Sequence, residues 1–131
     1  MAKITIIDDD MEYAENLSAI LRTDGHKTSI LDTAENAVSA LVKDRPDLVI
    51  LDVMFPDNPA AGFDLARQVR RRWEIRDLPI ILLTAVNQEF PIDFSAKDID
   101  PEWMPVQDFI EKPVKKEKLL RKVNALLRER R

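Results

Sequence analysis

The chain has 131 residues, of which 45% are hydrophobic and 34% are charged, as is typical of a single globular domain spanning 1–131. Its net charge of −4 provides no overall attraction to nucleic acid, and the absence of cysteine excludes disulfide bonds and thiolate metal sites. Charges or prolines interrupt every apolar run before it reaches the ~20 residues that a membrane span needs. We therefore expect a cytoplasmic protein with no direct contact to membranes or nucleic acid.

Short β-branched runs alternate with stretches of helical period along the whole chain. The predicted strands are KITIID from residue 3, KTSIL from 27, LVILDV from 48, LPIILLTA from 78 and DFIEK from 108. Apolar stripes predict helices between and after them, carried by Ala14, Leu17, Ile20 and Leu21, by Ala37, Val38, Leu41 and Val42, by Leu65, Ala66, Val69 and Trp73, and by Leu119, Leu120, Val123, Leu126 and Leu127. Together with a helix after the fourth strand, we expect about five helices.

Several single residues suggest where these elements begin and end. Asp10 is predicted to cap the first helix, Gly25 to end it in a left-handed conformation, and Thr33 to cap the second helix. His26 falls in the turn after the first helix, where a surface position is expected. Trp73 is expected to pack at the end of the third helix.

The segment from Val86 to Asp108 differs from the rest of the chain. It should hold the fourth helix, but Pro91, Pro101 and Pro105 interrupt it and no long apolar stripe remains. We therefore predict a short or irregular fourth helix followed by a loop.

Strand–helix alternation predicts a doubly wound α/β fold, with parallel strands and right-handed crossover helices on both faces of the sheet. In such folds, functional groups gather at the carboxyl ends of the strands. Asp8 and Asp9 end the first predicted strand, Asp52 the third, Thr84 the fourth and Lys112 the fifth. All five are therefore expected at one edge of the sheet.

These residue types together predict phosphoryl-transfer chemistry. Three carboxylates cannot remain ionised at close range without a counter-ion, and Mg²⁺ is the divalent cation that best suits a few carboxylates and a carbonyl. Asp8 and Asp9 would hold the metal. Asp52 would act as nucleophile, because a carboxylate can accept a phosphoryl group as an acyl phosphate. Lys112 would neutralise phosphoryl charge, and Thr84 would donate a hydrogen bond to a phosphoryl oxygen.

The motifs IIDDD, LVILDVMFP, ILLTA and FIEKP, in this order along nearly the whole chain, resemble the receiver domain of bacterial response regulators. The resemblance implies a flavodoxin-like five-stranded parallel sheet of order 2-1-3-4-5. It also implies that Asp52 is phosphorylated by a sensor histidine kinase or a histidine phosphotransfer protein. Asp9 and Asp52 would bind Mg²⁺ directly, Asp8 mainly through water, and Met54 through its backbone carbonyl.

The resemblance further implies a conformational switch. Thr84 would move toward the phosphoryl group and the ring of Phe109 would turn inward behind it, while Lys112 pairs with the phosphoryl oxygens. The surface read by a downstream protein effector would then change. Such a protein catalyses only its own phosphotransfer and dephosphorylation, and whether it forms a homodimer stays open.

Two other classes of protein remain as alternatives. A phosphatase of the haloacid dehalogenase type also uses an aspartyl nucleophile with Mg²⁺, but it would place a second aspartate where this chain has Met54. A receiver-like module that binds partners without phosphorylation typically loses the acidic pair, the acceptor or the lysine, and this chain retains all of them.

The residues flanking the expected path of an attacking water are apolar here. Met54 lies two residues after Asp52, and Val86 lies two residues after Thr84. Neither side chain can orient water, so we expect a comparatively long-lived acyl phosphate. The double variant Met54→Asn/Val86→Glu should lose its phosphoryl group faster than the wild type in a time course of intact mass, and an unchanged decay rate would contradict this expectation.

Overall fold

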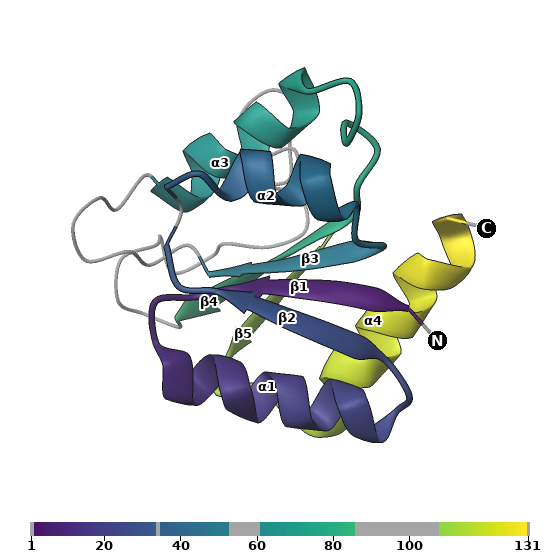
Figure 1. The fold of residues 1–131 in the computed structure, drawn as a ribbon. Helices are drawn as coiled ribbons and strands as arrows, with labels where there is room; N and C mark the ends of the chain where they lie inside the picture. Colours follow the sequence, from purple (N-terminus) through teal and green to yellow (C-terminus); the bar gives the residue numbers. More distant parts are fainter. Residues whose placement is uncertain (1, 34, 53–60, 86–107, 131) are drawn as a thin grey trace.

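The structure is a computed structural model that describes residues 2–33, 35–52, 61–85 and 108–130. Five strands and four helices lie in these ranges (Figure 1). In chain order they are β1 (Lys3–Ile7), α1 (Met11–Thr23), β2 (Lys27–Leu31), α2 (Ala37–Asp44), β3 (Leu48–Asp52), α3 (Ala61–Arg71), β4 (Ile80–Ala85), β5 (Asp108–Lys112) and α4 (Lys116–Arg130). The irregular fourth helix predicted between residues 86 and 108 lies outside the described residues.

The strands form one parallel sheet in the order β2-β1-β3-β4-β5, which confirms the predicted topology. Ile6 of β1 stands beside Ile30 of β2 on one side and Ile50 of β3 on the other. Helices α1 and α4 cover one face of the sheet, and α2 and α3 cover the other (Figure 1). The strand order reverses between β1 and β3, so this is the point where a doubly wound sheet is expected to hold its functional groups.

Two apolar cores, one on each face of the sheet, hold the layers together. Along β3, Leu48 and Ile50 belong to the core under α1 and α4, whereas Val49 and Leu51 belong to the core under α2 and α3. All four are almost fully buried. Successive strand residues point to opposite faces, and both faces are covered, so β3 is a continuous apolar run without polar alternation.

The predicted ends of α1 are confirmed, and the start of α2 is corrected. Asp10 caps α1, its Oδ1 accepting a hydrogen bond from the Tyr13 backbone N–H at 3.1 Å, and Gly25 follows the helix with a φ of +88°. The cap of α2 is Asn36, not Thr33. The hydroxyl oxygen of Thr33 instead accepts a hydrogen bond from the backbone N–H of Glu35, two residues along the loop.

The prediction that His26 lies at the surface is wrong. Its side chain is buried, with Nδ1 accepting a hydrogen bond from the Ala2 backbone N–H at 3.2 Å. Nε2 lies 3.1 Å from Oδ1 of Asn124 on α4 and 3.4 Å from a carboxylate oxygen of Asp24. The turn thus packs against two segments remote in sequence, which the local turn pattern alone could not indicate.

The prediction that Trp73 packs at the end of the third helix is also wrong. Helix α3 ends at Arg71, and Trp73 is 78% exposed in the turn that follows. The other three members of the predicted stripe, Leu65, Ala66 and Val69, are buried in the core. Because the helical period ends before Trp73, its ring is not carried onto the buried face.

This difference predicts unequal effects on stability. Leu65→Ala should lower the free energy of unfolding by about 2–5 kcal/mol, because it removes buried methyl groups and leaves a cavity. Trp73→Ala should change it by no more than about 0.5 kcal/mol, although it deletes a larger side chain. Urea unfolding of both variants beside the wild type checks this, and a Trp73→Ala cost equal to that of Leu65→Ala would contradict the exposed position.

In the ranges that the structure describes, no helix combines the length and apolar character required to cross a membrane.

Candidate functional site

Three carboxylates meet at the carboxyl ends of neighbouring strands. Asp8 and Asp9 directly follow β1, and Asp52 is the last residue of β3, the strand paired with β1. One oxygen from each carboxylate lies within 4.8 Å of the others. Asp8 and Asp52 are buried, whereas Asp9 is exposed. The sheet register therefore brings together the acidic residues that the sequence predicted at one edge.

The most buried carboxylate is Asp8, which has no exposed surface. Its Oδ1 accepts a hydrogen bond from the Asp10 backbone N–H at 2.9 Å, and its Oδ2 has no hydrogen-bond partner among the described residues. Burial raises the pKa of Asp8 to about 7, with a further increase from the neighbouring Asp52 carboxylate. The Asp10 N–H and the Lys112 ammonium oppose this increase in pKa.

Lys112, the last residue of β5, lies opposite the carboxylates. Its Nζ is 3.6 Å from Oδ2 of Asp8 and 3.5 Å from Oδ2 of Asp52. Strand β5 is separated from β3 by β4, so the lysine side chain reaches back across the sheet edge. Both contacts are ion pairs that are longer than a hydrogen bond. The ammonium is therefore close to both carboxylates, and their oxygens can still accept hydrogen bonds or bind a cation.

Tyr13 also contributes to the site, a role that was not predicted from the sequence. The Nζ of Lys112 lies 4.6 Å from the centre of the Tyr13 ring, and the Tyr13 hydroxyl accepts a hydrogen bond from the Val114 backbone N–H at 3.0 Å. One side chain on α1 thus supports both the lysine head group and the loop after β5. An aromatic residue three positions after the acidic run, in the first turn of α1, was the available signal.

The acidic group fits a small, hard cation. Its donors are carboxylate oxygens, the ligands that Mg²⁺ prefers, and a buried Asp8 oxygen without a hydrogen-bond partner is a polar atom that a cation would satisfy. The Lys112 ammonium alone leaves the cluster with more negative than positive charge. The arrangement can therefore hold a divalent ion and present a carboxylate, Asp52, beside it.

The remaining predicted site residues are only partly described. The backbone of Thr84 stands beside Glu111 in the β4–β5 register, one residue before Ala85 and Lys112 pair, so it lies at the same end of the sheet. The side chain of Thr84 and the whole of Met54 lie outside the described residues, as does Val86.

Phe109 is half-buried and packs against the core under α2 and α3. Above its ring, Nζ of Lys122 lies 5.7 Å from the centre and 2.8 Å from Oδ1 of Asp108. Phe109 is a residue of β5, the strand that also carries Lys112. Its ring lies between the apolar core and a lysine of α4.

Fold and site together define a flavodoxin-like α/β protein with an acidic, lysine-containing pocket at the carboxyl edge of its sheet. The family model of the response regulator receiver domain matches residues 4–124. The chain belongs to this family, whose members act as phosphoacceptor switches in two-component signalling and bind Mg²⁺ at an acidic pocket.

Curated relatives of two lengths match the chain. It is 30% identical to Protein PilH of Pseudomonas aeruginosa over 130 residues, which cover 97% of this chain and 98% of PilH. It is 32% identical to the DNA-binding response regulator MtrA of Mycobacterium tuberculosis over 126 residues, which cover 96% of this chain but 50% of MtrA. The chain thus spans nearly all of one relative and about half of the other.

A solved structure gives the same assignment. The signal receiver domain of a signal transduction histidine kinase from Syntrophus aciditrophicus superposes with a TM-score of 0.81 at 31% identity, covering 98% of this chain and 92% of that one. The expectation of a receiver-type fold is therefore confirmed.

Proposed function

We propose that this chain is a phosphorylation-activated switch in which Asp52 accepts a phosphoryl group from a sensor histidine kinase or a histidine phosphotransfer protein. An oxygen of the Asp52 carboxylate forms the bond to phosphorus while the bond from phosphorus to the donor imidazole nitrogen breaks. The observation that carries the proposal is the Lys112 ammonium, which lies at 3.6 Å and 3.5 Å from the Asp8 and Asp52 carboxylates. The ammonium can pair with the carboxylate before the transfer and with the phosphoryl oxygens during and after it.

Mg²⁺ is the proposed cofactor, held by Asp8, Asp9, Asp52 and the backbone carbonyl of Met54. The chemistry that bound Mg²⁺ supplies is neutralisation of charge on the phosphoryl oxygens. Asp8 binds best as a carboxylate, so metal binding and protonation compete for the same oxygens. The proposal is supported by the closeness of the three carboxylates and by the Asp8 oxygen that lacks a hydrogen-bond partner in the described part of the chain.

The proposed readout uses Thr84 and Phe109. Phosphorylation adds about one to two negative charges and strong acceptor oxygens at Asp52. Thr84 is proposed to donate a hydrogen bond to them, and Phe109 to turn into the space that Thr84 leaves, which changes the surface offered to a downstream protein effector. The half-buried position of Phe109, against one core and beside Lys122, supports a ring with two packing positions.

The proposal also takes residues 1–131 as a single receiver domain in the cytoplasm. It would make no direct contact with nucleic acid or membrane and would not act on other substrates. A phosphatase of the aspartyl-nucleophile type is disfavoured by Met54, and a module without phosphorylation is disfavoured by the complete set of acids and lysine.

Intact mass spectrometry tests this proposal. Incubation with Mg²⁺ and a small acyl or amide phosphodonor should add the mass of one phosphoryl group to the wild type and to Glu117→Gln, an exposed control on α4. Asp52→Asn should add none, because an amide is not a nucleophile toward phosphorus. Addition to Asp52→Asn at the wild-type level would refute the acceptor, and rapid multiple turnover of the donor would instead support the phosphatase.

A further inference from the structure

Among the described strands, β2 is an edge strand of the sheet and pairs with β1 alone. The Lys27 N–H donates to Ala2 O, and Leu31 O accepts from Asp8 N–H, so alternate residues of β2 use their backbone groups toward β1. The intervening residues, Thr28 and Ile30, therefore point their N–H and C=O groups to the open side. The edge thus offers a short row of backbone donors and acceptors to another chain.

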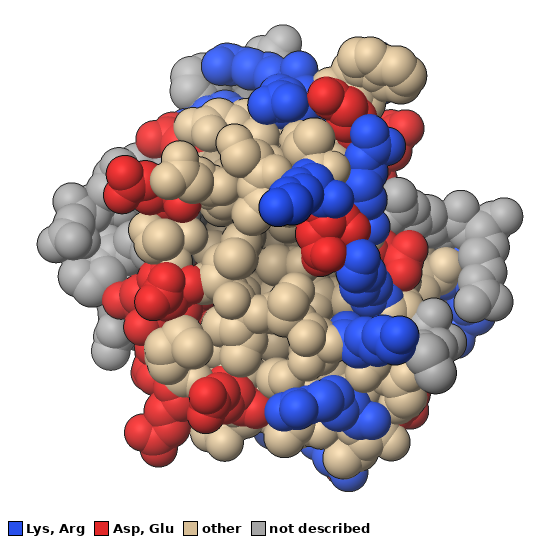
Figure 2. Space-filling model, in the orientation of Figure 1, with Lys and Arg blue, Asp and Glu red and all other residues tan. Residues whose placement is uncertain are grey.

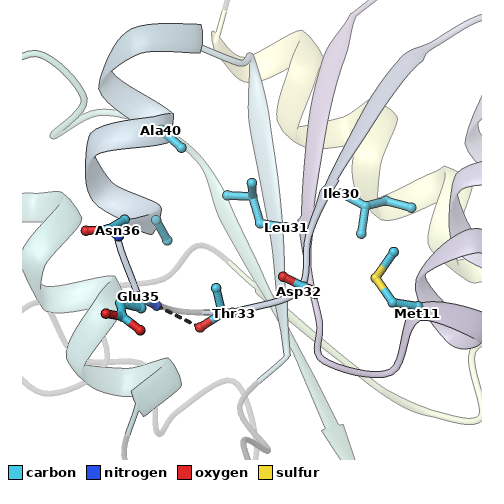
Figure 3. Close-up of a pocket in the computed structure, with 9 residues that line it drawn as sticks. Met11, Ile30, Leu31, Asp32, Thr33, Glu35, Asn36 and Ala40 are labelled. Atoms are coloured by element: carbon cyan, nitrogen blue, oxygen red, sulfur yellow. Dashed lines mark hydrogen bonds between the residues drawn. The ribbon is translucent and has the colours of Figure 1, made fainter.

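Grooves lie on both sides of this edge. Thr28 and Ile30 line one with α1, and Ser29 and Leu31 line another with α2. At the carboxyl end of β2 a cavity of about 330 Å³ opens, where Ile30 points toward Met11 of α1 and Leu31 points to the opposite face (Figure 3). Helix α1 packs against β2, where the hydroxyl oxygens of Ser18 and Thr28 lie 2.5 Å apart, but no other described strand pairs with the outer edge of β2. Figure 2 shows an uncharged surface running across this side of the molecule.

The charges beside the β2 edge are unevenly distributed. The carboxyl end is acidic, whereas the amino end carries Lys27 and Arg22 together with Asp24 and Asp44, of which Asp44 pairs with Lys3. Figure 2 shows acidic residues at one end of the uncharged surface and mainly basic residues, with some acidic ones among them, at the other. The acidic end is the carboxyl end of β2, where exposed Asp32 and Glu35 line the cavity. Lys27 is exposed at the amino end. The groove under α1 has the same polarity, since exposed Glu15 and Arg22 line it two helical turns apart.

We propose that the β2 edge is a self-association surface, on which β2 of a second copy of this chain pairs antiparallel to form one continuous sheet. A two-fold axis through Ser29 makes Thr28 exchange both backbone hydrogen bonds with Ile30 of the second copy, and symmetry supplies the reverse pair. All the outward backbone groups of Thr28 and Ile30 are then used. The inference does not depend on the phosphorylation of Asp52.

The distribution of charge along the edge favours a second copy of the chain as the partner, and antiparallel over parallel pairing of the two strands. A two-fold axis brings the basic end of one edge beside the acidic end of the other, so Arg22 of each copy meets Glu15 of the other. Parallel pairing would instead place like charges together, which is unfavourable. An edge with opposite charges at its ends is therefore complementary to itself. Because one short strand and two grooves form the contact, the association is weak, with a dissociation constant of about 10 μM to 1 mM.

Sedimentation analysis tests the proposal on the unphosphorylated full chain at concentrations up to about 1 mM. The wild type should show a reversible monomer–dimer equilibrium that weakens in high salt, because screening reduces the attraction between the exposed charges. Ser29→Lys should lower the association constant at least about 10-fold, because it sets two ammonium groups against each other at the axis. Gln68 is an exposed residue of α3, away from the β2 edge. Gln68→Lys adds the same charge there and should leave self-association unchanged.

Charge-reversal variants of Glu15 and Arg22 test whether this surface, and not another one, forms the dimer. Glu15→Arg alone and Arg22→Glu alone should each weaken self-association, because each makes the groove one sign throughout. An equimolar mixture of the two variants should associate again, since every contact then joins Arg to Glu. A wild type that stays monomeric throughout would overturn the proposal. So would a dimer that Ser29→Lys does not weaken, or two variants that fail to recover on mixing while both remain folded by circular dichroism.

Discussion

Asp8→Asn is expected to make the metal-free protein more stable than the wild type above pH 7, by up to about 4 kcal/mol. The Asp8 carboxyl has a pKa raised from 3.8 to about 7 in the folded protein, mainly by burial. Between these two values the folded state binds the proton more tightly than the unfolded state does. The stability of the wild type therefore falls as the pH rises from about 4 to about 7, and the full cost is present above that.

Asparagine carries no charge to desolvate, and its Oδ1 can still accept the hydrogen bond from the Asp10 N–H. The stability difference between variant and wild type should accordingly shrink toward pH 4. Mg²⁺ should stabilise the wild type at pH 8 and stabilise Asp8→Asn far less, because the variant lacks a ligand charge. Urea unfolding at several pH values, with and without Mg²⁺, measures both effects.

The control for this experiment is Glu117→Gln, which removes one exposed acidic charge outside the site and outside the β2 edge. It should follow the wild type at every pH and in Mg²⁺. If Asp8→Asn is less stable than the wild type at pH 8, burial of the Asp8 carboxylate does not cost stability. If Mg²⁺ stabilises the variant as much as the wild type, the Asp8 carboxylate does not contribute to Mg²⁺ binding.

Lys112→Met is expected to slow phosphoryl transfer from a small donor by about 100-fold, the usual effect of removing one preorganised charge from a transition state. Methionine keeps an unbranched stem of similar length but loses the ammonium between Asp8 and Asp52. The loss should appear in the rate constant at saturating Mg²⁺, measured by intact mass at early times. A rate within twofold of the wild type would contradict the role of the ammonium.

Tyr13 offers a graded companion to this variant. Tyr13→Phe retains the ring 4.6 Å from the Lys112 ammonium but loses the hydroxyl that binds the Val114 N–H, whereas Tyr13→Leu loses both. If the ring positions the lysine, Tyr13→Leu should slow phosphoryl transfer several-fold, and Tyr13→Phe should slow it less. Equal rates for Phe and Leu would mean that the hydroxyl contact alone matters.

The sheet and most of its site were predictable because their signals are local and repeated. Each strand is an apolar run bounded by polar residues, and the carboxyl-end rule then places Asp8, Asp52 and Lys112 at one edge without any knowledge of contacts. Asp10 was predictable as a cap because capping depends on the next three residues only.

The error at His26 and the omission of Tyr13 have a common physical cause, since both residues make contacts with segments far away in the sequence. His26 is buried because Asn124, 98 residues later, meets its ring. Tyr13 contacts Lys112 and Val114, which fold back against the start of α1. Trp73 was misassigned because the helical period was continued past Arg71, where α3 ends. No local pattern marks the burial of His26.

The central claim is that Asp52 is the residue that accepts the phosphoryl group. After incubation with Mg²⁺ and a phosphodonor, borohydride reduction converts an aspartyl phosphate into homoserine, which peptide mass spectrometry can locate. We predict homoserine at position 52 only, dependent on both the donor and Mg²⁺. Homoserine at position 8 or 9, or none at 52 in protein whose intact mass shows phosphorylation, would contradict the account.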